Sequence, residues 1–249
     1  MHWGGLRLAV TLLTAIPLRG GGTAPTRRQA CAAMAWAPAI GLLLGGLAAG
    51  VIELAGSVAR AGALLAAVLA IATLAALTRG LHLDGLADLA DALGSRLPAA
   101  RALEIMQRSD IGPYGVATLM LTLLIQVAAL ATAQELGRGL VAVSVAAVSG
   151  RLAITWACRR AVPAARGTGL GALVAGTQHP AVPLALTAAL LAGAAAAGWI
   201  FAVAAAAGLL AAYLVTRLAV RRIGGITGDV LGALVEIATA VCLLVTAIR

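Results

Sequence analysis

The chain has 249 residues, of which 62% are hydrophobic and 11% are charged. A soluble domain of this length would carry roughly 25% charged residues, so the composition excludes an ordinary soluble protein. The net charge of +9 comes from 18 arginines, with no lysine. A basic chain can bind nucleic acid, but arginine also marks cytoplasmic loops and contacts anionic lipid head groups. We therefore predict an all-α, polytopic membrane protein that lies in a lipid bilayer and has no nucleic-acid partner.

In chain order, residues 8–18 are apolar but too short to cross a bilayer, so we expect a helix at the membrane interface. Residues 181–216 lack charge and would run roughly 54 Å as one helix, so we expect a tight hairpin at Gly198-Trp199. We therefore predict a single integral-membrane domain over residues 1–249. The predicted transmembrane helices cover 31–52, 61–78, 111–133, 140–158, 181–199, 200–218 and 230–248.

The arginines are distributed unevenly between the two sides of this predicted bundle. With the N-terminus in the cytoplasm, only Arg60, Arg138 and Arg249 fall on the opposite side, and Arg151 lies inside a span. This asymmetry supports seven spans with the C-terminus outside, and it places the polar clusters described below at the cytoplasmic face. The arginines on cytoplasmic segments are Arg7, Arg19, Arg27, Arg28, Arg79, Arg96, Arg101, Arg108, Arg159, Arg160, Arg166, Arg217, Arg221 and Arg222.

Three of the nine acidic residues stand in the stretch 81-LHLDGLADLADALG-94. Asp84, Asp88 and Asp91 are spaced i, i+4, i+7, which places them on one helix face. Such carboxylates repel one another unless a cation neutralises them. Mg²⁺ takes oxygen ligands and often joins carboxylates to substrate phosphates, so we expect a metal site. The alternative is a solvated helix with Asp84 as its N-cap. That alternative explains one of the three aspartates and leaves the other two unexplained.

A second acidic pair lies near the C-terminus, in 224-GGITGDVLGALVEIATAVCLL-244. Asp229 and Glu236 are i, i+7, and Glu236 lies about two turns inside the last span, where an ionisable side chain indicates function. We predict that this helix faces the Asp84 helix and that both acids complete its metal site. Glycines such as Gly225 allow close approach either of a phosphate or of a neighbouring helix, and the alternative is helix packing around a lone glutamate.

Arginine and histidine side chains supply further candidates. Arg151 either snorkels to the interface or points a buried guanidinium at phosphate or carboxylate oxygens. Arg108 lies in 104-EIMQRSDIGPYG-115, and Arg166 lies in a glycine-rich loop. Each of these segments is either a connector or a loop that binds phosphate. His82 is a candidate general base, a group that orients a carboxylate, or a structural residue. Together these residues predict a metal-dependent membrane transferase that acts on a diphosphate.

Several segments resemble the cobalamin synthase family, the adenosylcobinamide-GDP ribazoletransferases. They are RGLHLDGLADLADALG, IMQRSDIGPYG, Gly150-Arg151, ARGTGLG and GGITGDVLGALVE, which appear in the family's order over nearly the whole chain. The family often has Asp-Ser-Arg where this chain has Arg108-Ser109-Asp110, so Asp110 is left out of the predicted metal ligands. Arg79 falls on a family-like basic position, and we add it to the predicted substrate-binding residues.

The resemblance implies a reaction. A hydroxyl of α-ribazole or of its 5′-phosphate attacks the diphosphate of adenosylcobinamide-GDP, and GMP leaves. The resemblance also implies Mg²⁺ as the cofactor. The catalytic roles follow from the physical argument above and not from the family, and they fall to His82, Asp84 and Asp88. The expected location is the bacterial inner membrane with the active site facing the cytoplasm, and association with other cobalamin-assembly enzymes is a further expectation.

Other readings of the same pattern are a CDP-alcohol phosphotransferase, a prenyltransferase and a transporter. The first would carry an Ala-Arg pair within one longer aspartate motif, and the second an Asn before its first aspartate, where this chain has His82-Leu83. A transporter would place its ionisable residues near the bilayer midplane and would often show internal repeats. The acids here gather near one face, which favours an enzyme.

Overall fold

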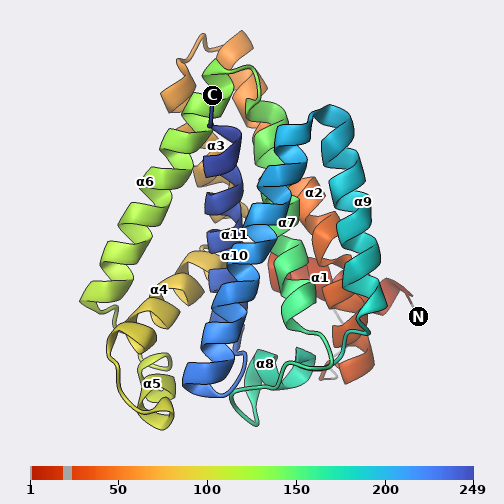
Figure 1. Ribbon diagram of the computed structural model, residues 1–249, viewed down its shortest axis with the longest axis vertical. Helices are drawn as coiled ribbons and strands as arrows, with labels where there is room; N and C mark the ends of the chain where they lie inside the picture. The colour runs from red at the N-terminus through yellow and green to blue at the C-terminus, as the bar shows by residue number, and fades with distance from the viewer. Residues whose placement is uncertain (1, 19–23) are drawn as a thin grey trace.

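The computed structural model describes residues 2–18 and 24–249, and it shows a bundle of helices (Figure 1), as predicted. Local sequence signals mark several helix starts. Thr26 and Gln29 form a capping box, Pro113 occupies the first turn of its helix, and the Thr227 hydroxyl caps the last helix. The helices are α1 (His2–Leu13), α2 (Arg27–Ser57), α3 (Ala63–Leu77), α4 (Leu81–Gly94), α5 (Ala99–Ile105), α6 (Pro113–Glu135), α7 (Gly139–Ala157), α8 (Gly169–Val174), α9 (Ala181–Ala197), α10 (Trp199–Ile223) and α11 (Gly228–Thr246).

In the part of the chain that the structure describes, five helices are long and apolar enough to cross a membrane, namely α2, α6, α7, α10 and α11. The other two predicted spans correspond to α3 and α9, which have 15 and 17 residues and so rise about 22 and 25 Å. That is less than a hydrocarbon core of about 30 Å. By length and composition, the described residues therefore contain five candidate spans, or six if α3 and α4 form one broken span. The sequence had predicted seven.

The hairpin predicted at Gly198-Trp199 is confirmed, because α9 ends at Ala197 and α10 begins at Trp199. Gly198 between them has φ +148°, a conformation that favours glycine. The helix predicted over 8–18 instead covers His2–Leu13. It ends early because the Thr14 hydroxyl donates to the Val10 carbonyl and accepts the Ile16 amide, so the chain leaves the helix.

The chain bends by 88° between α3 and α4. Arg79 and Gly80 both have positive φ at this bend, +55° and +68°, so the backbone reverses within a few residues. As a result, α4 crosses the end of the bundle instead of running along it, and we treat it as lying outside the spanning helices. Helix α11 lies in the middle, packed against α4, α6, α7 and α10 (Figure 1).

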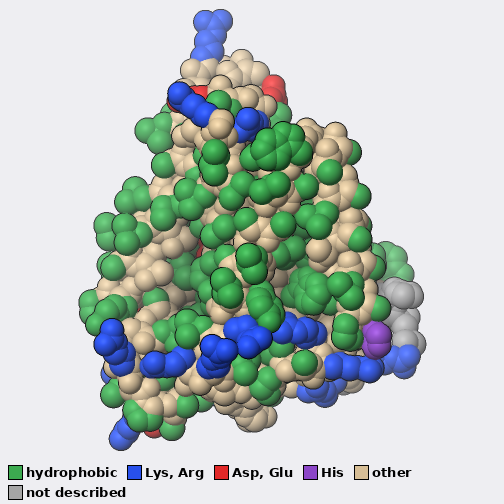
Figure 2. Space-filling view, viewed as in Figure 1, with side chains coloured by type: hydrophobic (Ala, Val, Ile, Leu, Met, Phe, Trp, Pro, Cys, Tyr) green, Lys and Arg blue, Asp and Glu red, His purple; other side chains and the backbone are tan. Residues whose placement is uncertain are grey.

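Charged side chains are separated along the bundle. Figure 2 shows arginines gathered in a band across the end that carries α5 and α8 in Figure 1, and a smaller group at the opposite end, near the C-terminus. Between them the visible surface is mostly apolar. This separation matches the uneven arginine distribution in the sequence, apart from Arg19, which lies outside the described residues.

A candidate active site at the arginine-rich end

Two glycines allow α4 and α11 to touch backbone to backbone. A Cβ atom on Gly85 would lie 2.6 Å from the Asp229 carbonyl oxygen, and one on Gly232 would lie 3.1 Å from His82 Cα. Small residues at such contacts let helix axes approach closely. The prediction that the last helix faces the aspartate helix is therefore confirmed. The glycine packing that stood as its alternative is also present, and it is the cause of the approach.

This contact gathers Asp84, Asp88 and Asp229 near Arg166. Asp84 is exposed and Asp88 is half-buried. Burial raises the pKa of Asp88 to about 7, and repulsion by Asp84, then Asp229, then Asp91 adds to the shift, which Arg166 opposes. The Thr227 hydroxyl lies 3.1 Å from Asp229 Oδ2 and donates to it, which fixes that carboxylate at the start of α11. Three carboxylates from two helices thus share one site.

Asp91 has different partners from its two neighbours on α4. Its Oδ2 accepts the Gly112 amide at 2.7 Å and its Oδ1 accepts the Gly115 amide at 2.9 Å. The side chain is 8% exposed. Asp91 therefore caps the N-terminus of α6, where free amides and the helix dipole favour a negative charge. Both carboxylate oxygens of this predicted metal ligand are engaged in holding α6.

Glu236 lies apart from the aspartates. It is seven residues beyond Asp229 on α11, which separates the two by about 10 Å along the helix. Gln126 of α6, which is 2% exposed, donates its side-chain amide to Glu236 Oε2 at 2.8 Å. The charged group that acts on Glu236 is Arg151. The structure thus places this predicted metal ligand deeper in the bundle, with an amide and an arginine.

His82 and Arg151 are buried with unsatisfied polar atoms. They are 3% and 2% exposed, and both ring nitrogens of His82 and Nε of Arg151 lack a hydrogen-bond partner within the described residues. His82 lines a cavity of about 200 Å³ that also contacts Asp84 and Asp229. Buried polar atoms without partners are rare in native proteins, so we expect a water molecule or a ligand to complete these hydrogen bonds.

Arg166 reaches the aspartates because its loop is docked against the start of α11. Ala165 donates its amide to the Ile226 carbonyl at 3.0 Å, and Ile226 donates to the Pro163 carbonyl at 3.0 Å. A Cβ on Gly225 would lie 2.4 Å from the Pro163 carbonyl oxygen, so only glycine fits there. Gly225 therefore positions the Arg166 loop. The Arg166 guanidinium also donates to the Leu103 carbonyl.

A second cavity, of about 220 Å³, is lined by Asp88. Arg108 and Asp110 line it, together with Asp91 and Ser95. Asp110, which was left out of the predicted metal ligands, thus shares a cavity with Asp88. Its position in a predicted phosphate-binding loop was the sequence feature that could have identified it.

Gln126 was also missing from the predicted site residues, although a polar side chain in an apolar span is a sequence feature that indicates function. Arg79 is exposed at the α3–α4 bend.

The donor set can be tested for its fit to a metal ion. Across residues 2–18 and 24–249, no three His, Cys, Asp or Glu side chains stand close enough together to coordinate one ion as they are. Even so, Asp84, Asp88 and Asp229 are near enough to raise the pKa of Asp88 through repulsion. Their oxygen donors are the type that Mg²⁺ prefers. The three aspartates therefore fit a hard divalent cation chemically and would have to converge to bind it.

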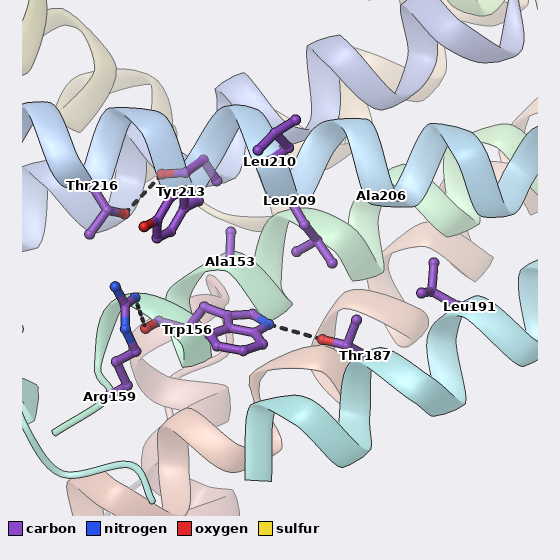
Figure 3. A pocket seen from close by; sticks show the side chains of 11 residues that line it. Ala153, Trp156, Arg159, Thr187, Leu191, Ala206, Leu209, Leu210, Tyr213 and Thr216 are labelled. Atoms are coloured by element: carbon purple, nitrogen blue, oxygen red, sulfur yellow. Dashed lines mark hydrogen bonds between the residues drawn. The ribbon is translucent and has the colours of Figure 1, made fainter. Parts of the chain in front are cut away.

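An apolar cavity of about 380 Å³ lies between α7, α9 and α10 (Figure 3). The Trp156 indole donates to the Thr187 hydroxyl at 2.9 Å, and Arg159 lies over the Tyr213 ring at 5.6 Å from its centroid. Trp156 and Ile154, which lines the His82 cavity, point to opposite sides of α7. The residues around this apolar cavity include no carboxylate, so we place no chemistry in it.

Comparisons with known proteins cover almost the whole chain. Residues 5–247 match the family described as cobalamin-5-phosphate synthase. An adenosylcobinamide-GDP ribazoletransferase of Frankia casuarinae is 45% identical over 97% of this chain and 93% of its own length. The enzyme of the same name from a Nocardioides species is 41% identical over 98% of both chains. No solved structure matches. Because the family match covers almost the whole chain, this protein belongs to the cobalamin-5-phosphate synthase family.

Proposed function

We propose that this multi-pass membrane enzyme, an adenosylcobinamide-GDP ribazoletransferase of cobalamin nucleotide-loop assembly, carries out its reaction at the α4–α11 contact. The oxygen of an α-ribazole hydroxyl, with or without a 5′-phosphate, forms a bond to the phosphorus attached to cobinamide. The bond from that phosphorus to the GMP oxygen breaks. The observation that carries this assignment is the meeting of Asp84, Asp88 and Asp229 beside Arg166.

We propose Mg²⁺ as the cofactor. Asp84, Asp88 and Asp229 would hold it, and when bound it would offset the negative charge of the diphosphate. Among the predicted ligands, Asp91 and Glu236 act through their protein partners in this proposal. Asp91 holds the start of α6, and Glu236 fixes Gln126 and faces the charge of Arg151.

The arginines and the histidine take separate roles in the proposal. Arg166, whose charge acts on Asp88, and Arg108, which lines a cavity with Asp88, bind phosphate oxygens, where guanidinium groups make short, charge-assisted hydrogen bonds. Arg79, at the exposed bend, supplies positive charge that draws anionic substrates to the site. Arg151, which is buried and acts on the charge of Glu236, holds that carboxylate in place. His82, neutral and without a hydrogen-bond partner in the described chain, accepts the proton of the attacking hydroxyl.

The arginine band supports a cytoplasmic location for this end of the bundle, since positively charged loops stay on that side (Figure 2). The homologues are bacterial, so the membrane in this proposal is the bacterial inner membrane. A site open to the cytoplasm can take nucleotide-activated substrate directly from the other cobalamin-assembly enzymes, with which we expect it to associate.

The test is GMP release by the purified protein in liposomes with adenosylcobinamide-GDP, α-ribazole 5′-phosphate and Mg²⁺. Asp84→Asn, Asp88→Asn and Asp229→Asn should each lower kcat at least about 100-fold, because each removes a carboxylate that holds charge at the reacting phosphate. Glu53→Gln, at an exposed position on α2, is the matched control and should keep full activity. Chelation should abolish GMP release, and added Mg²⁺ should restore it. Activity that persists after chelation would contradict the metal assignment.

A further inference from the structure

We infer that the cavity beside His82 is the binding site for the dimethylbenzimidazole ring of α-ribazole. This inference rests on the proposed function, since it assigns one substrate group to one part of that site. α-Ribazole carries a flat bicyclic aromatic base with two methyl groups and a single unsubstituted ring nitrogen. The cavity matches this group in size, in polarity and in its position relative to the carboxylates.

The size of the cavity limits what can enter it. Its volume is about 200 Å³. A protein cavity of about 150 Å³ holds benzene, and pockets for drug-sized ligands measure about 300 to 1,000 Å³. The cavity therefore accommodates one fused ring system. The corrinoid substrate is much larger and must lie outside, towards the exposed Asp84 at the rim.

The walls of the cavity are apolar except at one end. Leu13, Met34, Ile154 and Leu231 line it and are each at most 5% exposed, and they come from four different helices. His82, Asp84 and Asp229 form the polar end. A ligand that fits this cavity has an apolar body and one polar edge. The dimethylbenzimidazole ring with its attached ribose has this form.

Adenosylcobinamide-GDP contains two other bicyclic rings of similar size, its guanine and the adenine of its adenosyl group, and the adenine is attached to the corrinoid, which is too large to enter. Guanine carries a carbonyl, an amino group and ring nitrogens around its edge, and each needs a hydrogen-bond partner when it is buried. Apolar walls leave such groups unpaired, which is costly. The benzimidazole edge instead carries methyl groups, which gain free energy from contact with Met34, Ile154 and Leu231. The cavity therefore selects the acceptor base over guanine.

The polar end of the cavity then receives the ribose. With the base against the apolar walls, the ribosyl hydroxyl points to His82 and the carboxylates at the opening. The unsatisfied His82 nitrogens gain a hydrogen-bond partner there. The cavity thus orders the acceptor so that its hydroxyl faces the reacting phosphate, which is how a binding site contributes to rate through orientation.

Two wall positions allow the cavity to be changed without rebuilding the core. Leu170→Ala enlarges it at a partly exposed position. Gly228→Ala adds a methyl group that would lie 3.6 Å from Leu170 Cβ, an ordinary contact, and so narrows the cavity. The matched control is Gly46→Ala on α2, where an added Cβ meets nothing within 4 Å.

The experiment compares kcat/KM for α-ribazole 5′-phosphate with that for the same ribotide lacking both ring methyl groups. Burial of each methyl contributes about fourfold, so the native enzyme should prefer the dimethyl acceptor about 15-fold. Leu170→Ala and Gly228→Ala should lower this preference to about fourfold or less, mainly through KM. Gly46→Ala should keep it at the native value.

A binding readout separates this inference from the proposed function. Free 5,6-dimethylbenzimidazole should raise the unfolding temperature of the native protein and the Gly46→Ala variant, but raise it less in Gly228→Ala. It should also compete with the acceptor and not with adenosylcobinamide-GDP. An unchanged methyl preference in both wall variants, or competition with adenosylcobinamide-GDP, would overturn the inference about the cavity, while GMP release would still support the proposed function.

If the native protein releases no GMP, the proposed function is wrong. The shift in unfolding temperature with free 5,6-dimethylbenzimidazole would still test whether the cavity binds this ring.

Discussion

Asp91 offers a direct way to separate a helix cap from a metal ligand. Its two oxygens accept the Gly112 and Gly115 amides at 2.7 and 2.9 Å. Asp91→Asn keeps the size of the side chain but replaces one acceptor with an N–H group that faces another N–H. The variant loses one charge-assisted hydrogen bond and leaves a poorly paired amide, which should cost about 1.5–3 kcal/mol. Asp91→Ala loses both bonds and should cost about 3–5 kcal/mol.

The assay combines thermal unfolding in detergent with a Mg²⁺ titration of GMP release. For a chain of this size, 1 kcal/mol shifts the unfolding temperature by about 2–4 °C, so Asp91→Asn should lower it by about 3–12 °C. The half-saturating Mg²⁺ concentration should stay native in Asp91→Asn and rise in Asp88→Asn. If Asp91→Asn unfolds at the native temperature but needs more Mg²⁺, the carboxylate binds metal and the capping argument fails.

Three further predictions concern packing and topology. Gly85→Ala should force α4 away from α11 and abolish GMP release, while Gly46→Ala should leave activity native, as measured in the same assay. Gln126→Leu should leave Glu236 without its amide donor and lower the unfolding free energy by about 1–3 kcal/mol, and an unchanged unfolding midpoint would show that their 2.8 Å contact is unimportant. A reporter fused at Arg249 should map to the periplasmic side, because the C-terminus lies at the end of the bundle opposite the arginine band (Figures 1 and 2), and a cytoplasmic signal would contradict the cytoplasmic location proposed for that band.

The aspartate helix shows which features a local pattern can carry. The i, i+4, i+7 spacing predicts that Asp84, Asp88 and Asp91 share one helix face, and α4 is such a helix. The partners of the three side chains differ nonetheless. Asp91 meets amides more than 20 residues away on another helix, while Asp88 meets Asp229. Helical periodicity states which side chains lie together on one helix, but it does not state which other helix lies opposite each turn.

The span count shows the same limit in another form. Apolar runs locate every helix that crosses the bundle, and Gly198 marks the hairpin correctly. The lengths of α3 and α9 and the 88° bend at Arg79-Gly80 depend on how the chain turns at the bundle end. A run of apolar residues does not carry that information, because the residues at the bend are compatible with a continuing helix or with a turn.

The sequence by itself determined that this is a helical membrane protein, that its arginines gather at one end, and that its carboxylates belong to two segments. Its motifs also identified the family correctly. Only the tertiary structure decided that Asp84, Asp88 and Asp229 meet while Glu236 lies deeper with Gln126, and that a cavity opens beside His82. The physical reason is that these contacts depend on the close approach of α4 and α11 at Gly85 and Gly232. Such an approach is a property of two surfaces that fit together, and neither segment's periodicity specifies it alone.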